Sequence, residues 1–444
     1  MLEYYLGLAL RSLRRNVVLT TLMVAAVGVG VGTSMTILTT LMVMSGNPIP
    51  DRSSTLFVPQ IDNWGAKSQR SASDSEFVAT QLSYRDAMGF MSARLGVRQA
   101  AMYGLGLNVS PAAGVPFPAV GRATFRDFFA MFEVPFRSGN VWSEAEDDKQ
   151  EQVVVLSSKL ADRAFPHLDP IGRTITLGGR DYRVMGVIRP WTPTPRFYDL
   201  SIPYGETEDF YIPFTTAIAE QIESDGPFIC MGSGDVAQGW PGWVGSECVW
   251  LQFWVELPTP GYVRHFREFL QAYAADQQKT GRFHWLPWVQ LYDVTDWVAY
   301  KYNHVVPQGI RIDALMAIGF LLVCLVNAIA LMLAKFSARG AELAIRRAMG
   351  ASRIDIFMQC LAESLIVGLV GGVVGLGLTA AGLGALRALH GVQGSQTATG
   401  HLYSQNLESV VVTLVVAVIA TGCSGLYPSL RASRLKAGLQ IKVQ

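Results

Sequence analysis

One stretch of 28 residues without a charged side chain decides the fold of this chain: VVLTTLMVAAVGVGVGTSMTILTTLMVM, residues 17–44. About 20 apolar residues in a helix cross a hydrocarbon core of roughly 30 Å, so this stretch is long enough to span a membrane with some tilt. Arg11, Arg14 and Arg15 precede it, as basic residues precede a signal peptide. However, a signal peptide has only about 7–15 apolar residues, and no small-residue cleavage site follows here. We therefore interpret the stretch as an uncleaved signal anchor.

Three further charge-free stretches lie in the last third of the chain. Residues 314–334, 364–386 and 410–430 contain 21, 23 and 21 residues, and each is long enough to cross a membrane. Only 16% of the 444 residues are charged, against roughly 25% in ordinary soluble domains. The net charge of +1 gives no reason to expect nucleic acid as a partner, and five cysteines are too few for a disulfide scaffold. The sequence predicts an integral membrane protein with four transmembrane helices.

The distribution of basic residues predicts which side of the membrane each segment faces. The segment before residue 17, the segment 335–355 and the tail after residue 430 together carry 12 basic and 3 acidic residues. Residues 46–308 carry 22 basic and 29 acidic ones. Because loops rich in Lys and Arg stay in the cytoplasm, both termini are predicted to be cytoplasmic and the large domain to lie outside. The expected segments are a cytoplasmic amphipathic segment at 1–16, transmembrane helices at 17–45, 309–335, 354–387 and 409–430, an outer domain at 46–308, a cytoplasmic helix at 336–353, a short outer loop at 388–408 and a cytoplasmic tail at 431–444.

The outer domain is predicted to contain two similar strand–helix–strand units. In the first, Ser83 and Asp86 have the spacing of a capping box that opens a helix. In the second, a Pro- and Gly-containing break at 258–261 precedes a helix with Phe266 and Tyr273 on one face. Strand-like stretches flank these helices, at 55–61 and 97–103 in the first unit and at 248–257 and 283–292 in the second. We interpret both as βαβ-like units.

The residues between these two units are mostly strand and loop. The clearest element is a hairpin, in which Gly178-Gly179 joins alternating strands at 174–177 and 180–188. The predicted fold class is an α-helical membrane protein with four transmembrane helices and a large extracytoplasmic α+β domain. In that domain, the two βαβ-like units bracket an inserted β-rich subdomain.

Sequence patterns of catalytic and nucleotide-binding sites are missing. The chain has no G-x-x-x-x-G-K-[ST] P-loop, no H-E-x-x-H, no C-x-x-C and no G-x-S-x-G. Its six histidines do not have ligand spacing, and we interpret the acidic run at 144–151 as a solvated loop rather than a metal site. We therefore predict no catalytic residue, no metal site and no cofactor bound by this chain.

Small residues in the spans indicate where helices pack closely. Gly-x-x-x-Gly pairs allow two helix backbones to approach in lipid, and they can join helices of one chain or of two. The pairs are Gly28 with Gly32, Gly368 with Gly372, and Gly371 with Gly375. Glu363 stands at the entry to the third span, where it is either a partner for a cytoplasmic arginine or, as we favour, an interfacial residue.

The cytoplasmic segment 335–355 is predicted to contain a short basic helix. Residues 338–349 are good helix formers, and Glu342 precedes Arg346 in the favourable ion-pair order. Gly350 suits a helix C-cap, and Ser352 with Asp355 has the spacing of a new capping box. The helix can lie among lipid headgroups or serve as a docking surface for a cytoplasmic subunit, and the residues themselves leave both interpretations open.

Two of the five cysteines, Cys230 and Cys248, fall in the outer domain, where oxidation is permitted. We predict a disulfide between them, the alternative being two small buried thiols. The remaining three cysteines lie in or beside the spans.

Several stretches resemble the MacB-like, FtsX-like family of ABC transporter permeases. In the membrane part these are RGAELAIRRAMGA at 339–351, Glu363-Ser364 with the glycine-rich span that follows, and GLYPSLRA at 425–432. In the outer domain, residues 153–165 and 169–188 are similar to that family's periplasmic core domain. The order of one span, a large domain and three spans is similar too.

The resemblance implies a permease in the bacterial cytoplasmic (inner) membrane that pairs with a second permease, identical or paralogous. Each permease would bind a separate ABC ATPase that holds ATP and Mg²⁺, and a periplasmic adaptor is a further candidate partner. Because the chain starts almost directly at its first span, we expect the ATPase on another polypeptide. The helix at 342–350 would be the coupling helix, and its expected ATPase-coupling residues are Arg339, Glu342, Leu343, Arg346, Arg347, Met349 and Gly350.

Two functions fit this build. The first is export or efflux of a drug, peptide or lipoprotein-like cargo, which we favour because the outer domain is large and has two parts. The second is FtsX-like regulation, in which the outer domain controls a cell-wall hydrolase or a sensor kinase. A membrane-anchored enzyme is disfavoured by the missing catalytic patterns. Residues 190–250, rich in Pro, Gly and Trp, match no pattern of the family, so the cargo stays open.

Overall fold

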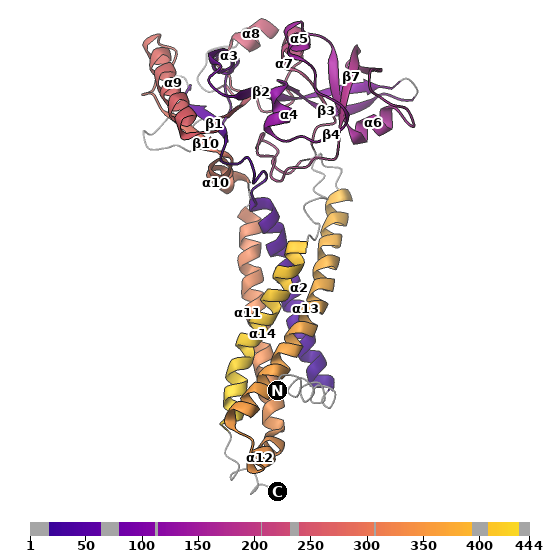
Figure 1. Ribbon diagram of the computed structural model, residues 1–444, viewed down its shortest axis with the longest axis vertical. Helices are drawn as coiled ribbons and strands as arrows, with labels where there is room; N and C mark the ends of the chain where they lie inside the picture. Colours follow the sequence, from indigo (N-terminus) through magenta and orange to yellow (C-terminus); the bar gives the residue numbers. More distant parts are fainter. Residues whose placement is uncertain are drawn as a thin grey trace. The chain divides into compact units, whose positions relative to one another are not determined.

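The computed structural model describes residues 17–63, 80–111, 114–205, 207–230, 239–305, 308–392 and 407–434. These residues form two compact units, a helical unit from residues up to 44 and from 306 onward, and a sheet domain at 45–305 (Figure 1). The segment predicted at 1–16, most of the loop predicted at 388–408 and the end of the predicted tail lie outside the described residues.

The described residues of the helical unit include four helices that are long and apolar enough to cross a membrane. They are α2 (Val17–Ser45), α11 (Gln308–Ala338), α13 (Arg353–Val392) and α14 (Leu407–Ser433). They contain the four charge-free stretches of the sequence, because length and hydropathy depend on the local residues alone. In the described part of the chain, a further short helix, α12 (Gly340–Ala348), lies between α11 and α13.

The sheet domain is built on one mixed sheet with the order β10-β1-β9-β2-β3-β8-β5-β7-β4, and β6 pairs with β2 and β7. Its strands are β1 (Leu56–Ile61), β2 (Arg98–Ser110), β3 (Phe117–Thr124), β4 (Phe136–Gly139), β5 (Val153–Ser157), β6 (Thr174–Leu177), β7 (Arg180–Ile188), β8 (Phe210–Pro213), β9 (Gln252–Glu256) and β10 (Val289–Asp293). Its helices are α3 (Tyr84–Ala93), α4 (Asp127–Met131), α5 (Glu144–Asp148), α6 (Ser158–Ala164), α7 (Phe214–Ala219), α8 (Trp240–Gly245), α9 (Pro260–Lys279) and α10 (Val294–Val305).

The two predicted βαβ-like units are interleaved rather than side by side. β1 and β2 both pair antiparallel with β9, which lies between them, and β9 and β10 both pair antiparallel with β1. The order β10-β1-β9-β2 is therefore that of a split βαβ arrangement, as in ferredoxin-like folds. The chain enters the sheet domain at β1 and leaves it after β10. These two strands are neighbours, because β1 is paired with β10 over five residues.

The inserted part continues this sheet instead of forming a detached one. β2 is 13 residues long; its first half pairs with β9, and its second half pairs with β3 and β6. Helix α3 begins at the predicted cap, where the Ser83 hydroxyl accepts a hydrogen bond from the Asp86 N–H. The predicted hairpin is present as β6 and β7, with Gly178 and Gly179 both at positive φ.

Two strand predictions were too long. The last strand begins at Val289 rather than Phe283. The Phe283 N–H donates a hydrogen bond to the Gln277 carbonyl at the end of α9, and Pro287 has no N–H to donate to a neighbouring strand. Residues 248–251 lie outside β9 and make only isolated bridges, at Val249 and Leu251.

Both faces of the sheet are buried, because adjacent strand residues point to opposite sides. Phe57 of β1 belongs to one apolar cluster with α3, α6, α7 and α9, whereas its neighbours Leu56 and Val58 belong to a second cluster with α4 and α10. Figure 1 shows these helices around the sheet.

Candidate coupling site and membrane helices

Helix α12 has one face against its own chain and one face exposed. Leu343 is buried among residues of α11 and α13. Ile345 and Met349, four residues apart, are 56% and 76% exposed. The prediction that Leu343 anchors a cytoplasmic partner is therefore wrong, because its side chain faces the membrane helices; Ile345, which we did not predict, takes its place on the exposed face. A helical wheel could have suggested this, since Leu343 and Ile345 lie on different faces of the helix.

The end of α12 and the start of α13 are shaped by local signals in the sequence. After Met349, Gly350 takes a φ of +104°, a backbone conformation that side chains disfavour, and the helix stops. Ser352 and Asp355 form a reciprocal capping box, with Ser352 N–H to the Asp355 carboxylate at 2.8 Å and Asp355 N–H to the Ser352 hydroxyl at 3.2 Å. Helix α13 therefore starts three residues after the glycine.

A network of charged side chains fastens α12 to its neighbours. Arg339, the residue before α12, lies 3.0 Å from Glu363 of α13 and 3.1 Å from Glu342. Arg346 lies 3.1 Å from Glu342 and donates to Gln359 of α13 at 2.9 Å. The predicted pair of Glu342 with Arg346 thus belongs to a larger network.

Glu363 is buried and paired with basic side chains, which is the alternative to the interfacial placement that the sequence favoured. Its side chain is 2% exposed and lies 3.1 Å from the ammonium of Lys335, which is 1% exposed. An acid this close to the hydrocarbon is stable only when paired, and here it has two cationic partners. The sequence left pairing with a cytoplasmic arginine open, but the identity of the two partners depends on how α11, α12 and α13 pack.

The six glycines of the Gly-x-x-x-Gly pairs lie at helix contacts within the chain. A Cβ added to Gly28 of α2 would lie 2.8 Å from Val374 of α13, and one added to Gly371 would lie 2.8 Å from Val27 of α2. Gly32 and Gly375 meet along the same contact, whereas Gly368 and Gly372 face Thr421 and Ala417 of α14. Helix α13 therefore packs against α2 on one glycine face and against α14 on another.

Comparison with known proteins gives consistent results for both units. Residues 19–238 match the family described as MacB-like periplasmic core domain, and residues 314–437 match the family described as FtsX-like permease C-terminal. The chain belongs to the MacB-like, FtsX-like family of ABC transporter permeases.

Two relatives of this permease carry export names. The chain is 26% identical over 309 residues to the "Probable syringafactin export ATP-binding/permease protein SyfD" of Pseudomonas syringae pv. tomato. This alignment covers 69% of the chain and 40% of that protein. The chain is 27% identical over 262 residues to the "Macrolide export ATP-binding/permease protein MacB" of Escherichia coli K12, which covers 57% of the chain and 34% of that protein. The chain thus matches only about a third to two fifths of the length of these relatives. Among solved structures, the chain is similar to the periplasmic region of MacB from Actinobacillus actinomycetemcomitans. The alignment covers 57% of this chain and 96% of that structure, with 14% identity and a TM-score of 0.36.

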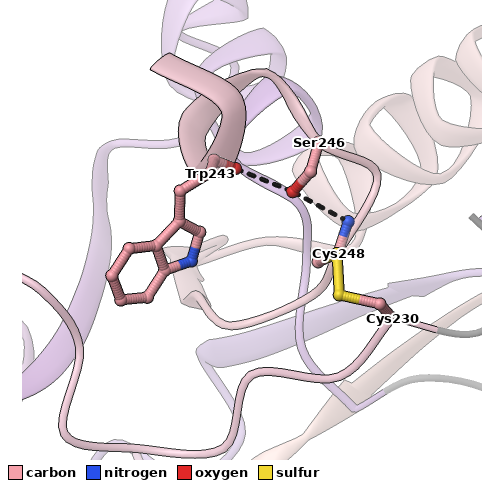
Figure 2. Close-up of a disulfide and its surroundings, with 4 residues drawn as sticks. All are labelled: Cys230, Trp243, Ser246 and Cys248. Carbon is pink, nitrogen blue, oxygen red and sulfur yellow. Dashed lines mark hydrogen bonds between the residues drawn. A yellow bond between two sulfur atoms is a disulfide. The ribbon is translucent and has the colours of Figure 1, made fainter. Parts of the chain in front are cut away.

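In the sheet domain of the permease, Cys230 and Cys248 form a disulfide (Figure 2). Beside it, the Ser246 hydroxyl accepts from the Cys248 N–H at 3.3 Å and donates to the Trp243 carbonyl at 2.7 Å. The bond therefore holds residue 230 next to the segment that carries α8. The remaining three cysteines are free.

A buried group of four charges joins β3 to the loop between β7 and β8. The loop belongs to the stretch 190–250, which we expected to match no pattern of the family; that expectation is wrong up to residue 238, because the family match extends that far. Arg122 of β3 lies 2.6 Å from Glu208 and 2.7 Å from Asp199, and Arg196 lies 3.1 Å from Glu208. Tyr198 donates a hydrogen bond to Glu208 at 2.9 Å. Burial alone would raise the pKa of Asp199, but the charges of Arg122 and Arg196 lower the pKa to about 2.

The acidic run at 144–151 is only partly the solvated loop that we expected. Its first part is helix α5, which starts with a capping box between Ser143 and Glu146. Asp147 is buried and accepts a hydrogen bond from Thr215, while Glu146 pairs with Arg183 at 2.8 Å. Glu146 and Asp147 are thus engaged in the packing of the domain, whereas Glu144 and Asp148 are exposed. Among the residues that the structure describes, no three His, Cys, Asp or Glu side chains gather as metal ligands.

Proposed function

We propose that this chain is the permease subunit of an ABC exporter, and that it passes ATP-driven motion from a separate cytoplasmic ATPase to its sheet domain. The observation that carries the proposal is the two-sided helix α12, which exposes Ile345 and Met349 and is fastened to α13 through Gln359 and Glu363. A subunit docked on the exposed face would move α13 with the helix. The 444 residues contain no P-loop, so ATP and Mg²⁺ would be held by an ATPase module outside these residues.

The architecture of the sheet domain supports the proposal that motion of the membrane helices is passed to this domain. Helix α2 leads along the chain into β1, and β10 leads through α10 towards α11. Because β1 and β10 are hydrogen-bonded neighbours, motion of either helix reaches the same edge of the sheet. The export names of the relatives favour cargo transport over regulation. A second permease, identical or paralogous, and a periplasmic adaptor complete the proposed assembly.

The test uses the full chain co-expressed with its candidate ABC ATPase and reconstituted in lipid nanodiscs. The ATPase should co-purify, and ATP should change amide hydrogen exchange within residues 45–305 relative to a hydrolysis-deficient ATPase. Cells that contain both active subunits should also accumulate less of a fluorescent macrolide than cells with the deficient ATPase. An ATPase that hydrolyses ATP at full rate while exchange in the sheet domain stays unchanged would refute the transmission of motion.

We further propose that the sheet domain lies outside the cytoplasm and both termini inside, as the charge distribution predicts. The disulfide supports this side for the sheet domain, since disulfides persist in oxidising compartments. A single cysteine replacing Asp148, in a background without free thiols, should react with an impermeant maleimide in intact spheroplasts. Reaction only after the membrane is permeabilised would reverse the proposed orientation.

A further inference from the structure

One carboxylate joins three helices of the permease. Glu363 of α13 lies 3.1 Å from Lys335 in the last turns of α11 and 3.0 Å from Arg339 at the start of α12. Both partners are buried or nearly so, with side-chain exposures of 1% and 11%. The pairs are therefore shielded from solvent and cannot be replaced by contacts with water.

Breaking either pair leaves an uncompensated charge in a shielded place. Removing one member of a buried pair is strongly unfavourable, whereas exposed pairs contribute little. Helix α12 consequently cannot move away from α11 or α13 without separating Glu363 from a cation. The ends of the three helices are expected to move together.

A second contact fixes the orientation of α12. Arg346 donates to Gln359, which lies one turn before Glu363 on the same face of α13. Arg346 and Arg339 also share Glu342. Two contacts along α12 prevent it from pivoting about one of them.

From α13, packing leads to the rest of the helical unit. Gly371 and Gly375 lie against α2, and Gly368 and Gly372 lie against α14. The Thr379 hydroxyl adds a hydrogen bond to the Gly32 carbonyl of α2 at 3.2 Å. Lys335 lies on α11 itself. Through these contacts Glu363 is connected to both helices that continue along the chain into the sheet domain, α2 and α11.

We propose that Glu363 is the positioning residue that divides motion of α12 between α11 and α13, and so delivers it to both connections with the sheet domain. The inference rests on the proposed function for the source of the motion. The Glu363 side chain is 2% exposed, so its proposed role lies within the chain: it keeps α12 in register with the two membrane helices.

The experiment compares Glu363→Gln with the wild-type chain, both reconstituted with the ATPase in nanodiscs. Glutamine keeps the size of the side chain but removes its charge. Coupling between sites typically corresponds to factors of about 5–150, so we expect at least a fivefold loss of the ATP-dependent exchange change in residues 45–305. Co-purification of the ATPase should stay within about twofold of wild type, because the exposed face of α12 is unchanged. Without nucleotide, amides of α12 should exchange faster.

Ser364→Ala is the matched control. Ser364 is the next residue on α13 and is buried. Its hydroxyl donates to the Cys360 carbonyl at 3.1 Å and contacts the Met332 sulfur of α11 at 3.5 Å, so the control removes a neutral contact between α11 and α13 and leaves the charged side chains in place. It should transmit like wild type. In Glu363→Asp, the side chain is one methylene shorter, so its carboxylate cannot reach both cations. This variant should lose about half or more of the ATP-dependent change in amide exchange of residues 45–305.

The outcomes distinguish a failure of the proposed role of Glu363 from a failure of the proposed function of the chain. Wild-type transmission by Glu363→Gln would overturn the role of Glu363, and so would an equal loss in Ser364→Ala, which would indicate general packing damage. If Glu363→Gln cannot be recovered in nanodiscs, wild-type transmission by Glu363→Asp would overturn it. If the wild-type complex itself shows no ATP-dependent change, the proposed function fails instead.

Discussion

Replacing Arg122 by methionine is expected to destabilise the sheet domain by about 3–5 kcal/mol, because it leaves two buried carboxylates with too little positive charge. Arg122 is fully buried and contacts both Asp199 and Glu208. Arg196 alone would then face both acids. Unfolding of the purified full chain in detergent by urea, followed by tryptophan fluorescence, measures the change in free energy.

Arg137→Met provides the control for this variant. Arg137 pairs with Asp162 at 2.8 Å, a separation like those of Arg122, but the two side chains are 54% and 65% exposed. Exposed pairs contribute about 0–1 kcal/mol, so the urea midpoint should hardly move. Equal destabilisation by the two variants would show that burial of the Arg122 group does not govern the stability of this domain.

The same group predicts how stability depends on pH. The pKa of Asp199 is about 2 in the folded domain, below its ordinary value, and the pKa of Glu208 is also lowered; in both cases burial opposes the shift and the charge of Arg122 causes it. A depressed folded-state pKa means that the stabilisation is complete above the unfolded value of about 4 and is lost as the pH falls towards 2. The urea midpoint should therefore drop between pH 5 and pH 3, and the drop should be smaller in Arg122→Met.

Replacing Ile345 by aspartate should reduce co-purification of the ATPase by at least about 30-fold. Apolar anchors at the centre of an interface commonly contribute 2 kcal/mol or more, and a carboxylate in their place adds a desolvation cost. The substitution leaves Arg339 and Arg346 in their network, so α12 should stay fastened to α13. The measurement is the ratio of ATPase to permease after affinity purification from detergent-solubilised membranes.

Ile345→Leu is the control, since it keeps an apolar side chain at the same exposed position and should bind normally. Met349→Asp, one turn further along the exposed face, should weaken binding in the same direction. Reversing the charges of Arg346 and Arg347 is a less direct test, because Arg346 also holds Gln359 of α13. Normal ATPase recovery with Ile345→Asp would show that this face of α12 is not the docking surface.

Local features of the sequence determined several elements of this protein. The four membrane helices follow from uninterrupted apolar length, which no tertiary contact has to supply. The caps at Ser83 and Ser352 and the Gly178-Gly179 turn depend on residues a few positions apart, so their geometry is contained in short segments. The position of α12 between two spans has the same local origin.

Tertiary structure alone decided which of these elements meet. The glycine pairs predicted close packing but not its partner, because a small-residue face fits any other helix with a matching groove; the fold placed α13 between α2 and α14. Glu363 looked interfacial in the sequence because its cations are 28 and 24 residues earlier in the chain, and only the packing of α11 and α12 against α13 brings Lys335 and Arg339 to it. Likewise, Arg122 and Glu208 are 86 residues apart, and the pairing of β3 with β8 joins them. Contacts of this kind depend on the faces that meet after folding, and no local pattern records them.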